Sequence, residues 1–165
     1  IYSFFALYAN IDGFTGREDI IPYDERTFED KWIISKLNSL IKYVGKRLDE
    51  YDPTKASRKI NAFINDDLSN WYIRLNRKRF WVGDLSEDKM MAYQTLFECL
   101  YKLSIVSSPF IPFYSEKLFL NLNKFNVEDS ESVHLLEFPK SIDNLISKSL
   151  ERKMLYAQNL SLIHI

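Results

Sequence analysis

Apolar residues recur at steps of three and four along several long stretches of this chain, and this spacing constrains the fold more than any other feature. The stretch that follows Thr27 carries Phe28, Trp32, Ile33, Leu37, Leu40, Ile41 and Val44. Such spacing places apolar side chains on one face of an α-helix. Turn-forming residues are scarce, because the 165 residues include only four Gly and five Pro. A few long helices are therefore favoured over many short strands.

Capping and turn residues divide this pattern into separate helices. Thr27, with Asp30 three residues later, predicts the start of a helix that ends near residues 45–48. Further helices are expected from about Lys55 to Trp81, from after Ser86 to before Pro109, from about Pro112 or Tyr114 to Leu122, and from Ile142 to about Ile163. Residues 123–140 are expected to form a loop, with a short extended piece at 133–138. We predict an all-α fold, a helical bundle of about four to five helices.

The first 26 residues differ from the rest of the chain. They carry aromatic residues followed by an Asp12-Gly13 turn signal, which predicts a connecting segment or a short helix. Residues 27–165 are expected to form the helical bundle domain. The chain begins with Ile1 and its first methionine is Met90, so we expect it to be a piece of a longer protein.

Charge and cysteine content exclude several classes of function. The 22 Lys and Arg residues balance 23 Asp and Glu residues, which gives a net charge of -1 and no long-range attraction for a polyanion. The single cysteine excludes an internal disulfide and a cysteine-based zinc site, and no other metal site is expected. No apolar run approaches the ~18–20 residues of a membrane span, and no signal peptide is recognisable. A cytoplasmic protein without a membrane partner is predicted.

A basic and aromatic cluster stands out in DLSNWYIRLNRKRFW, residues 67–81. It holds Arg74, Arg77, Lys78 and Arg79 within six positions, without an acidic residue among them. At ~100° per residue, a core-facing stripe should contain Ile60, Ile64, Leu68, Trp71 and Leu75. The neighbouring flank should present Asn70, Arg74, Arg77 and Trp81, with Lys78 and Arg79 on either side of the stripe near the end of the helix.

This cluster has two interpretations. Guanidinium groups can grip phosphate oxygens through two parallel hydrogen bonds, and Trp81, Tyr72 or Phe80 could stack on an unpaired base. Alternatively, Lys and Arg favour the C-terminal ends of helices because of the helix dipole, and aromatic residues there simply pack. The cluster alone does not distinguish RNA binding from a structural role.

Four motifs, in this order along the chain, add a resemblance to a known family. DKWIISKLN at residues 30–38 is similar to D-[RK]-W-I-L-S-[RK]-L, and residues 68–81 are similar to L-S-N-W-Y-x-R followed by basic residues and Phe-Trp. SSPFIPFYSEKLF and SVHLLEFP are similar to A-P-[FI]-x-P-F-x-[SA]-E-x-[LI] and S-V-H-L-x-x-[FW]-P. Together they resemble the anticodon-binding helical domain of class I aminoacyl-tRNA synthetases, and within that class the isoleucyl-tRNA synthetases. The resemblance covers about residues 6–158, and the terminal LSLIHI departs from it.

The resemblance implies a parent enzyme that couples isoleucine to its tRNA through an aminoacyl-adenylate, with ATP and magnesium as cofactors. The H-I-G-H and K-M-S-K-S signatures of that activity are absent from this chain. We therefore expect a fragment without catalytic residues and without a cofactor of its own. Residues 1–26 would connect it to the catalytic region, which lies outside these residues.

The partners implied by the resemblance are the anticodon stem-loop of an isoleucine tRNA and the remaining domains of the same synthetase. The candidate RNA-binding residues are Arg74, Arg77, Lys78 and Arg79 for phosphate groups, and Asn70 and Trp81 for bases. Two alternatives stay open: the same domain of a valine, leucine or methionine enzyme, and a helical protein-interaction module. A steep fall of affinity with salt would indicate RNA rather than protein as the partner.

Overall fold

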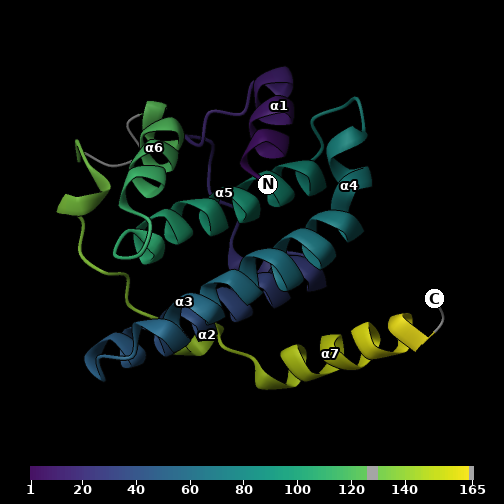
Figure 1. The fold of residues 1–165 in the computed structure, drawn as a ribbon. Helices are drawn as coiled ribbons and strands as arrows, with labels where there is room; N and C mark the ends of the chain where they lie inside the picture. The colour runs from purple at the N-terminus through teal and green to yellow at the C-terminus, as the bar shows by residue number, and fades with distance from the viewer. Residues whose placement is uncertain (126–129, 164–165) are drawn as a thin grey trace.

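The computed structural model describes residues 1–125 and 130–163, and within these residues the chain is all-α, without a strand (Figure 1). The predicted fold class is confirmed. Four residues of the predicted loop, 126–129, and the last two residues of the LSLIHI terminus lie outside the described residues.

Two long helices, α2 (Phe28–Asp49) and α5 (Glu87–Ser107), cross in the centre of the molecule. Each begins where a side chain caps the first turn. The Thr27 hydroxyl accepts a hydrogen bond from the Asp30 amide at 3.3 Å, and the Ser86 hydroxyl accepts one from the Lys89 amide at 3.2 Å. Both predicted helix starts are confirmed, because local capping decides them.

The next element is a continuous rod made of α3 (Pro53–Ala62), the π-helix η2 (Phe63–Ile73) and α4 (Arg74–Trp81). Its first half lies beside α2 (Figure 1). The Asp52 carboxylate caps its start by accepting from the Lys55 amide at 3.1 Å. The rod confirms the single long helix predicted over about 55–81.

The remaining helices are α1 (Tyr2–Asp12), α6 (Pro112–Leu122) and α7 (Lys148–Ile163). Short 3₁₀ turns occupy Tyr23–Glu25, Asn123–Phe125, Val133–Leu135 and Asp143–Leu145. With the rod counted once, the described part of the chain holds six helical rods, one more than the upper prediction. The additional rod is α1, in the stretch predicted to be a connecting segment or a short helix.

Two sequence predictions are wrong in detail. The last helix begins at Lys148 rather than Ile142, because side chains of α2 accept hydrogen bonds from backbone amides that precede it. The Ile142 amide donates to Asn38 Oδ1, and the Ser147 amide donates to Ser35 Oγ. The predicted extended piece at 133–138 begins instead as a 3₁₀ turn. Both departures depend on contacts or local bonding that apolar spacing does not reveal.

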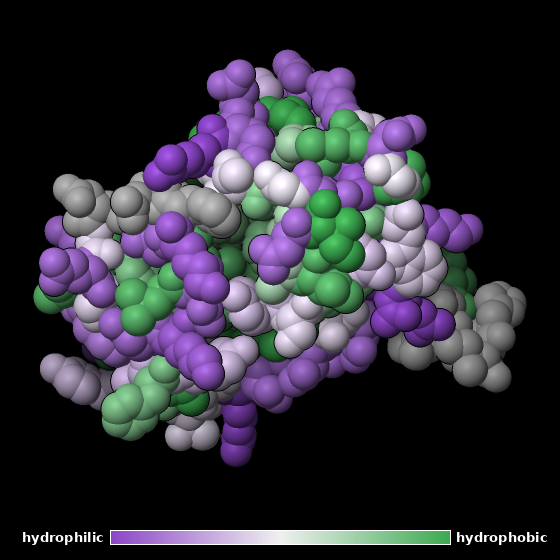
Figure 2. Space-filling view, turned by 90° about the horizontal axis from the view of Figure 1, so that it is seen from above, coloured by the Kyte–Doolittle hydropathy of each residue, from purple (hydrophilic) through white to green (hydrophobic). Residues whose placement is uncertain are grey.

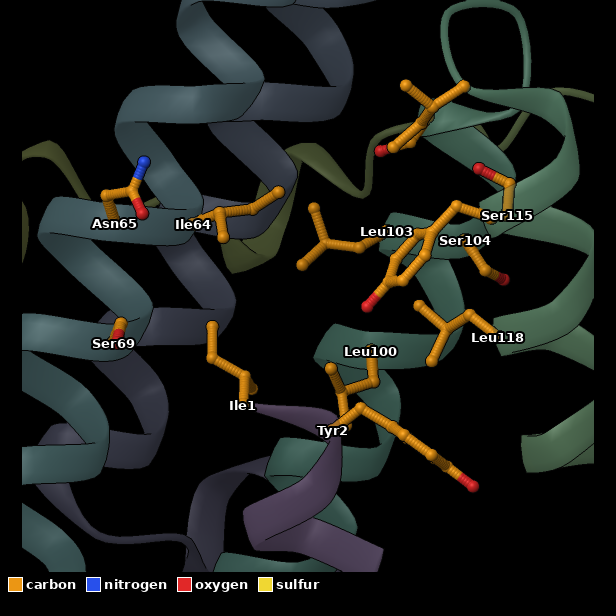
Figure 3. Close-up of a pocket in the computed structure, with 13 residues that line it drawn as sticks. Ile1, Tyr2, Ile64, Asn65, Ser69, Leu100, Leu103, Ser104, Ser115 and Leu118 are labelled. Carbon is orange, nitrogen blue, oxygen red and sulfur yellow. The ribbon is translucent and has the colours of Figure 1, made fainter.

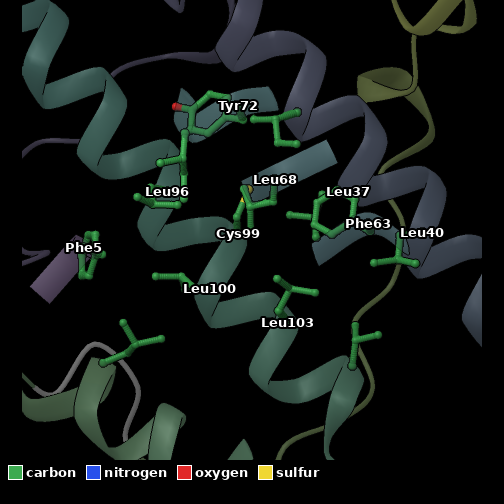
Figure 4. Close-up of a cluster of buried hydrophobic side chains, with 14 of the residues drawn as sticks. Phe5, Leu37, Leu40, Phe63, Leu68, Tyr72, Leu96, Cys99, Leu100 and Leu103 are labelled. Atoms are coloured by element: carbon green, nitrogen blue, oxygen red, sulfur yellow. The ribbon is translucent and has the colours of Figure 1, made fainter. Parts of the chain in front are cut away.

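One apolar core joins α1, α2, the rod, α5 and α6 (Figure 4). Phe5, Ala9 and Phe14 from the first 26 residues belong to this core. Cys99 on α5 is fully buried in it, and burial raises the pKa of its thiol. The domain division after residue 26 stays a prediction.

The last helix, α7, is attached to α2 through polar groups as well as through the apolar core. The Ser35 and Ser39 hydroxyls donate to Glu151 Oε1 at 2.8 and 2.7 Å, and the Lys148 ammonium donates to the Ser39 hydroxyl at 2.9 Å. Met154 is buried in the joint. None of the helices found in the described residues is long and apolar enough to cross a membrane.

Candidate nucleic-acid interface

The π-helix η2 sets which residues of the following helix reach the surface. A π-turn bonds residue i to i+5 and takes up more residues than the 3.6 of an α-turn, so it rotates the residues that follow. Tyr72 and Asn76 are therefore buried, with Tyr72 fully enclosed, whereas Leu75 is 49% exposed. The face of α4 that meets the core differs by about one residue from the face that an ideal α-helix would present.

The predicted core stripe is therefore only partly correct. Ile60 and Leu68 are buried, and Ile64 and Trp71 are half-buried against the core, but Leu75 lies on the surface. The prediction assumed ~100° per residue through the whole rod, and the π-turns break that assumption. Tyr72 and Phe80 are enclosed in the core, so neither is placed to stack on a base.

Five of the six predicted RNA-binding residues lie on the surface. Asn70, Arg74, Arg77, Lys78 and Trp81 are all exposed, and the exposed fraction of Trp81 is 57%. No residue in 1–125 or 130–163 forms an ion pair or hydrogen bond with the side chains of Arg74, Arg77 or Lys78. These three cations are therefore available to an external anion, next to an exposed indole.

Arg79 is placed differently from the other five. Its guanidinium group forms ion pairs with Asp30 at 2.9 Å and Asp88 at 2.8 Å, and only 13% of its side chain is exposed. It also donates to Asn76 Oδ1 at 3.0 Å. The structure thus groups Arg79 with the core of the bundle rather than with the exposed flank.

The surroundings of Arg79 change the acid–base properties of two side chains. Burial alone would lower the pKa of Arg79, but its hydrogen bonds to Asp30 and the charge of that carboxylate outweigh burial and raise the pKa. Burial, together with the charge of Asp30, raises the pKa of the Tyr72 phenol well above its ordinary value. Arg79 is therefore charged and Tyr72 is a neutral donor, which gives its hydrogen to Asp30 Oδ1 at 2.5 Å.

A second buried ion pair supports the loop that follows Trp81. The Lys89 ammonium lies 2.5 Å from Asp12 Oδ2 and donates to the Val82 carbonyl at 2.7 Å. The Tyr93 hydroxyl also donates to Asp12. These contacts join the end of α1, the start of α5 and Val82, the first residue after α4. They therefore fix the C-terminal end of α4.

Sequence reasoning missed Asp30, Asn76, Asp88 and Lys89 as residues that support the site. Asp30 was recognised only as part of a helix cap, and its second role depends on a partner 49 residues away. Ideal helical spacing offered no signal for Asn76, because it places Leu75 rather than Asn76 toward the core. Apolar spacing does not show which polar residues are buried together.

A cavity of about 300 Å³ lies between η2, α5, α6 and the start of α1 (Figure 3). Apolar side chains such as Ile64, Leu100 and Leu103 line it, together with Ser104 and Ser115. No charged side chain lines it. It therefore does not fit a phosphate group, and the basic flank of α4 remains the better candidate for a polyanion.

The described residues contain no group of three or more His, Cys, Asp or Glu side chains that could hold a metal ion. Together, α4 and the last turn of η2 offer a set of cations, an amide at Asn70 and an indole at Trp81. Cations bind phosphate oxygens, amides can pair with base edges, and an exposed indole can stack on a base. This combination defines a candidate surface for single-stranded or looped RNA.

Comparison with known proteins identifies the family of this chain. Residues 30–163 match the family described as the anticodon-binding domain of tRNA ligase. The chain therefore belongs to the anticodon-binding domain family of tRNA ligases.

Its curated relatives include isoleucine–tRNA ligases. The chain is 52% identical to the isoleucine–tRNA ligase of Cytophaga hutchinsonii over 165 residues, 99% of this chain and 15% of that protein. It is 50% identical to the isoleucine–tRNA ligase of Bacteroides thetaiotaomicron over 161 residues, 97% of this chain and 14% of that protein. The corresponding protein of Clostridium tetani is 46% identical over 155 residues. The chain thus spans about 15% of the length of the curated relatives it matches.

Proposed function

We propose that this chain binds the anticodon stem-loop of an isoleucine tRNA, as the anticodon-binding domain of an isoleucine–tRNA ligase. The observation that carries the proposal is the exposed flank of α4. There, Arg74, Arg77 and Lys78 have no partner among the described residues and lie on the same short helix as the exposed Trp81. The cations are local to this helix, since the chain as a whole has a net charge of -1.

The proposed mechanism is binding, in two parts. Arg74, Arg77 and Lys78 contact backbone phosphates and fix the position of the stem-loop on α4. Asn70 and Trp81 contact unpaired bases, because an amide offers both a donor and an acceptor and an indole offers a face for stacking. Phosphate contacts supply most of the affinity, and base contacts supply the preference for one anticodon.

In the proposed parent ligase, the attachment of isoleucine to tRNA would occur outside this chain. ATP and magnesium would act there, and the chain would align the tRNA for that region. Exposed apolar residues on α1 and α6 support a second contact with the rest of such an enzyme: Leu7 is 56%, Ile11 70% and Phe113 91% exposed. The face of the molecule seen from above, which carries these helices, mixes hydrophobic and hydrophilic patches (Figure 2). A role on tRNA would place the protein in the cytoplasm.

The experiment is a binding titration with isolated stem-loops. The purified chain is titrated with an isoleucine tRNA anticodon stem-loop and with a valine tRNA stem-loop, each at low and at moderate salt. Preference for the isoleucine stem-loop, with affinity that falls steeply with salt, is the expected result. Equal affinity for both would support another ligase of this family, and absence of binding at low salt would contradict the proposal.

Matched variants locate the surface. Arg74→Ala and Arg77→Ala should each weaken binding and lower the slope of log affinity against log salt by about 0.7 to 0.9, because each removes one phosphate contact. Arg58→Ala is the control, since Arg58 is an exposed arginine near the other end of the same rod. Equal losses from Arg58→Ala and Arg77→Ala would show that general charge, rather than the α4 flank, carries the affinity.

A further inference from the structure

We propose that Arg79 and Asp30 act on RNA binding indirectly, as positioning residues that fix α4 and thereby set the direction in which its exposed cations point. The inference rests on the proposed function and deepens it. It assigns to Arg79 a different role from that of Arg74, Arg77 and Lys78, although all four belong to one basic cluster in the sequence.

The guanidinium group of Arg79 has no donor left for a phosphate. An arginine side chain carries five N–H donors. Nε donates to Asp88 Oδ2, one terminal nitrogen donates to Asp30 Oδ1 and Asn76 Oδ1, and the other donates to Asp30 Oδ2 and the Asp88 carbonyl, all between 2.7 and 3.0 Å. Five acceptors thus take up five donors. A direct contact with RNA would require breaking at least one of them.

The partner carboxylate of Asp30 is equally well held. Its side chain is fully buried, and both oxygens accept from Arg79 in the paired geometry that arginine and carboxylate groups prefer. The Tyr72 hydroxyl also donates to Oδ1, and the Thr27 hydroxyl donates to Oδ2 at 2.8 Å. Asp30 therefore cannot itself contact RNA, so any effect of its substitution on RNA binding must pass through the fold.

One guanidinium group consequently joins three helices. Asp30 lies in the first turn of α2 and Asp88 in the first turn of α5, while Arg79 lies in the last turn of α4. Beyond α4 the chain enters an exposed stretch at residues 82–88. Arg79 immediately follows Lys78 and lies two residues from Arg77 and from Trp81, so a tilt of α4 would move all three.

The arrangement also unites two motifs of the sequence. Asp30 opens DKWIISKLN, and Arg79 belongs to the basic run that ends in Phe-Trp. Asp30 and Arg79 are 49 residues apart in the sequence, and the two motifs meet through this pair. The first motif, which contains no exposed basic cluster, thereby takes part in presenting the second.

The test uses the whole chain and the isoleucine stem-loop, with Asp30→Asn and Arg79→Lys. If the pair positions α4, both variants should weaken binding by about tenfold, while the slope of log affinity against log salt stays unchanged. If Arg79 instead contacts RNA directly, the expected change in RNA affinity is different. Asp30→Asn would then free a cation and bind RNA equally or more tightly, Arg79→Lys would keep most of the affinity, and that result would overturn the inference.

Amide hydrogen exchange of residues 74–81 gives a second readout without RNA. Exchange in α4 should become faster in both variants, because α4 loses the hydrogen bonds between Arg79 and Asp30. Exchange in α5 should change little. Should Asp30→Asn fail to fold, Asp88→Asn replaces it, since the Asp88 side chain is 51% exposed. Failure of the wild-type chain to bind the stem-loop would reject the proposed function. Unchanged exchange in α4 would reject the positioning role of Arg79 and Asp30.

Discussion

The Lys89 ammonium and the Asp12 carboxylate form an ion pair at 2.5 Å, although only 2% and 9% of their side chains are exposed. Lys89 lies in the first turn of α5 and Asp12 is the last residue of α1, so the pair fastens the first helix to the centre of the bundle. Burial would raise the pKa of Asp12, but the hydrogen bonds from Lys89 and Tyr93 outweigh it and lower the pKa. The carboxylate is therefore charged at neutral pH.

Replacing Lys89 by Met should destabilise the protein strongly. The change leaves the Asp12 charge buried without its partner, which costs about 3 kcal/mol in comparable pairs. Urea unfolding measures the difference. The double variant Asp12→Asn with Lys89→Met should recover part of the loss, because it removes the unpaired charge. Equal losses from the single and double variants would show that packing, not charge, explains the effect.

The π-helix predicts an unequal response of two leucines on the same rod. Leu68→Ala should cost about 3 kcal/mol, because Leu68 is fully buried, whereas Leu75→Ala should cost about 0.5 kcal/mol or less, because Leu75 is 49% exposed. The two substitutions are chemically identical, so each serves as the control for the other in urea unfolding. A larger loss for Leu75→Ala would indicate that α4 keeps the register of an ideal α-helix.

The exposed indole of Trp81 predicts a contribution to RNA binding that does not depend on salt. Trp81→Ala should weaken binding of the isoleucine stem-loop by about 1–3 kcal/mol if the ring stacks on a base. The slope of log affinity against log salt should not change, since no cation is removed. Arg77→Ala is the matched comparison, and it should lower that slope by about 0.7 to 0.9. A lower slope for Trp81→Ala would contradict stacking.

The joint between α2 and α7 should weaken in acid. Burial would raise the pKa of Glu151, but hydrogen bonds from Ser39, Lys148 and Ser35 outweigh it and hold the pKa below the ordinary value of 4.5. The unfolded chain then binds a proton more readily than the folded chain does. The stabilisation from Glu151 is therefore complete above about pH 4.5 and is lost as the pH falls through the lower, folded value.

Amide exchange of α7 between pH 6 and pH 3, corrected for intrinsic rates, measures this loss. The variant Glu151→Gln should be less stable at pH 6 and should lose less on acidification, because it has no carboxylate to protonate. Asp143→Asn is a suitable control, since its exposed carboxylate pairs with Lys42 nearby. A pH dependence of α7 that is the same in Glu151→Gln and wild type would assign the acid effect to another group.

Local sequence features predicted the helices well. Thr27, Asp52 and Ser86 each cap a helix through an amide three residues away, so neighbouring residues contain the information needed to place these starts. Helical spacing also placed Asn70, Arg74, Arg77 and Trp81 on one flank of the rod, and all four are exposed. The resemblance in sequence motifs agrees with the family match over residues 30–163.

The sequence by itself therefore determined the helical class of the fold, the capped helix starts and the family, since all of these depend on short-range spacing or on ordered motifs. Only the tertiary structure decided the register of α4 and the role of Arg79. The π-turns of η2 rotate α4 so that Tyr72 and Asn76, rather than Leu75, meet the core. Arg79 belongs to the interior because Asp30, 49 residues earlier, lies within hydrogen-bonding distance in the folded chain, and a contact of that kind leaves no trace in local spacing.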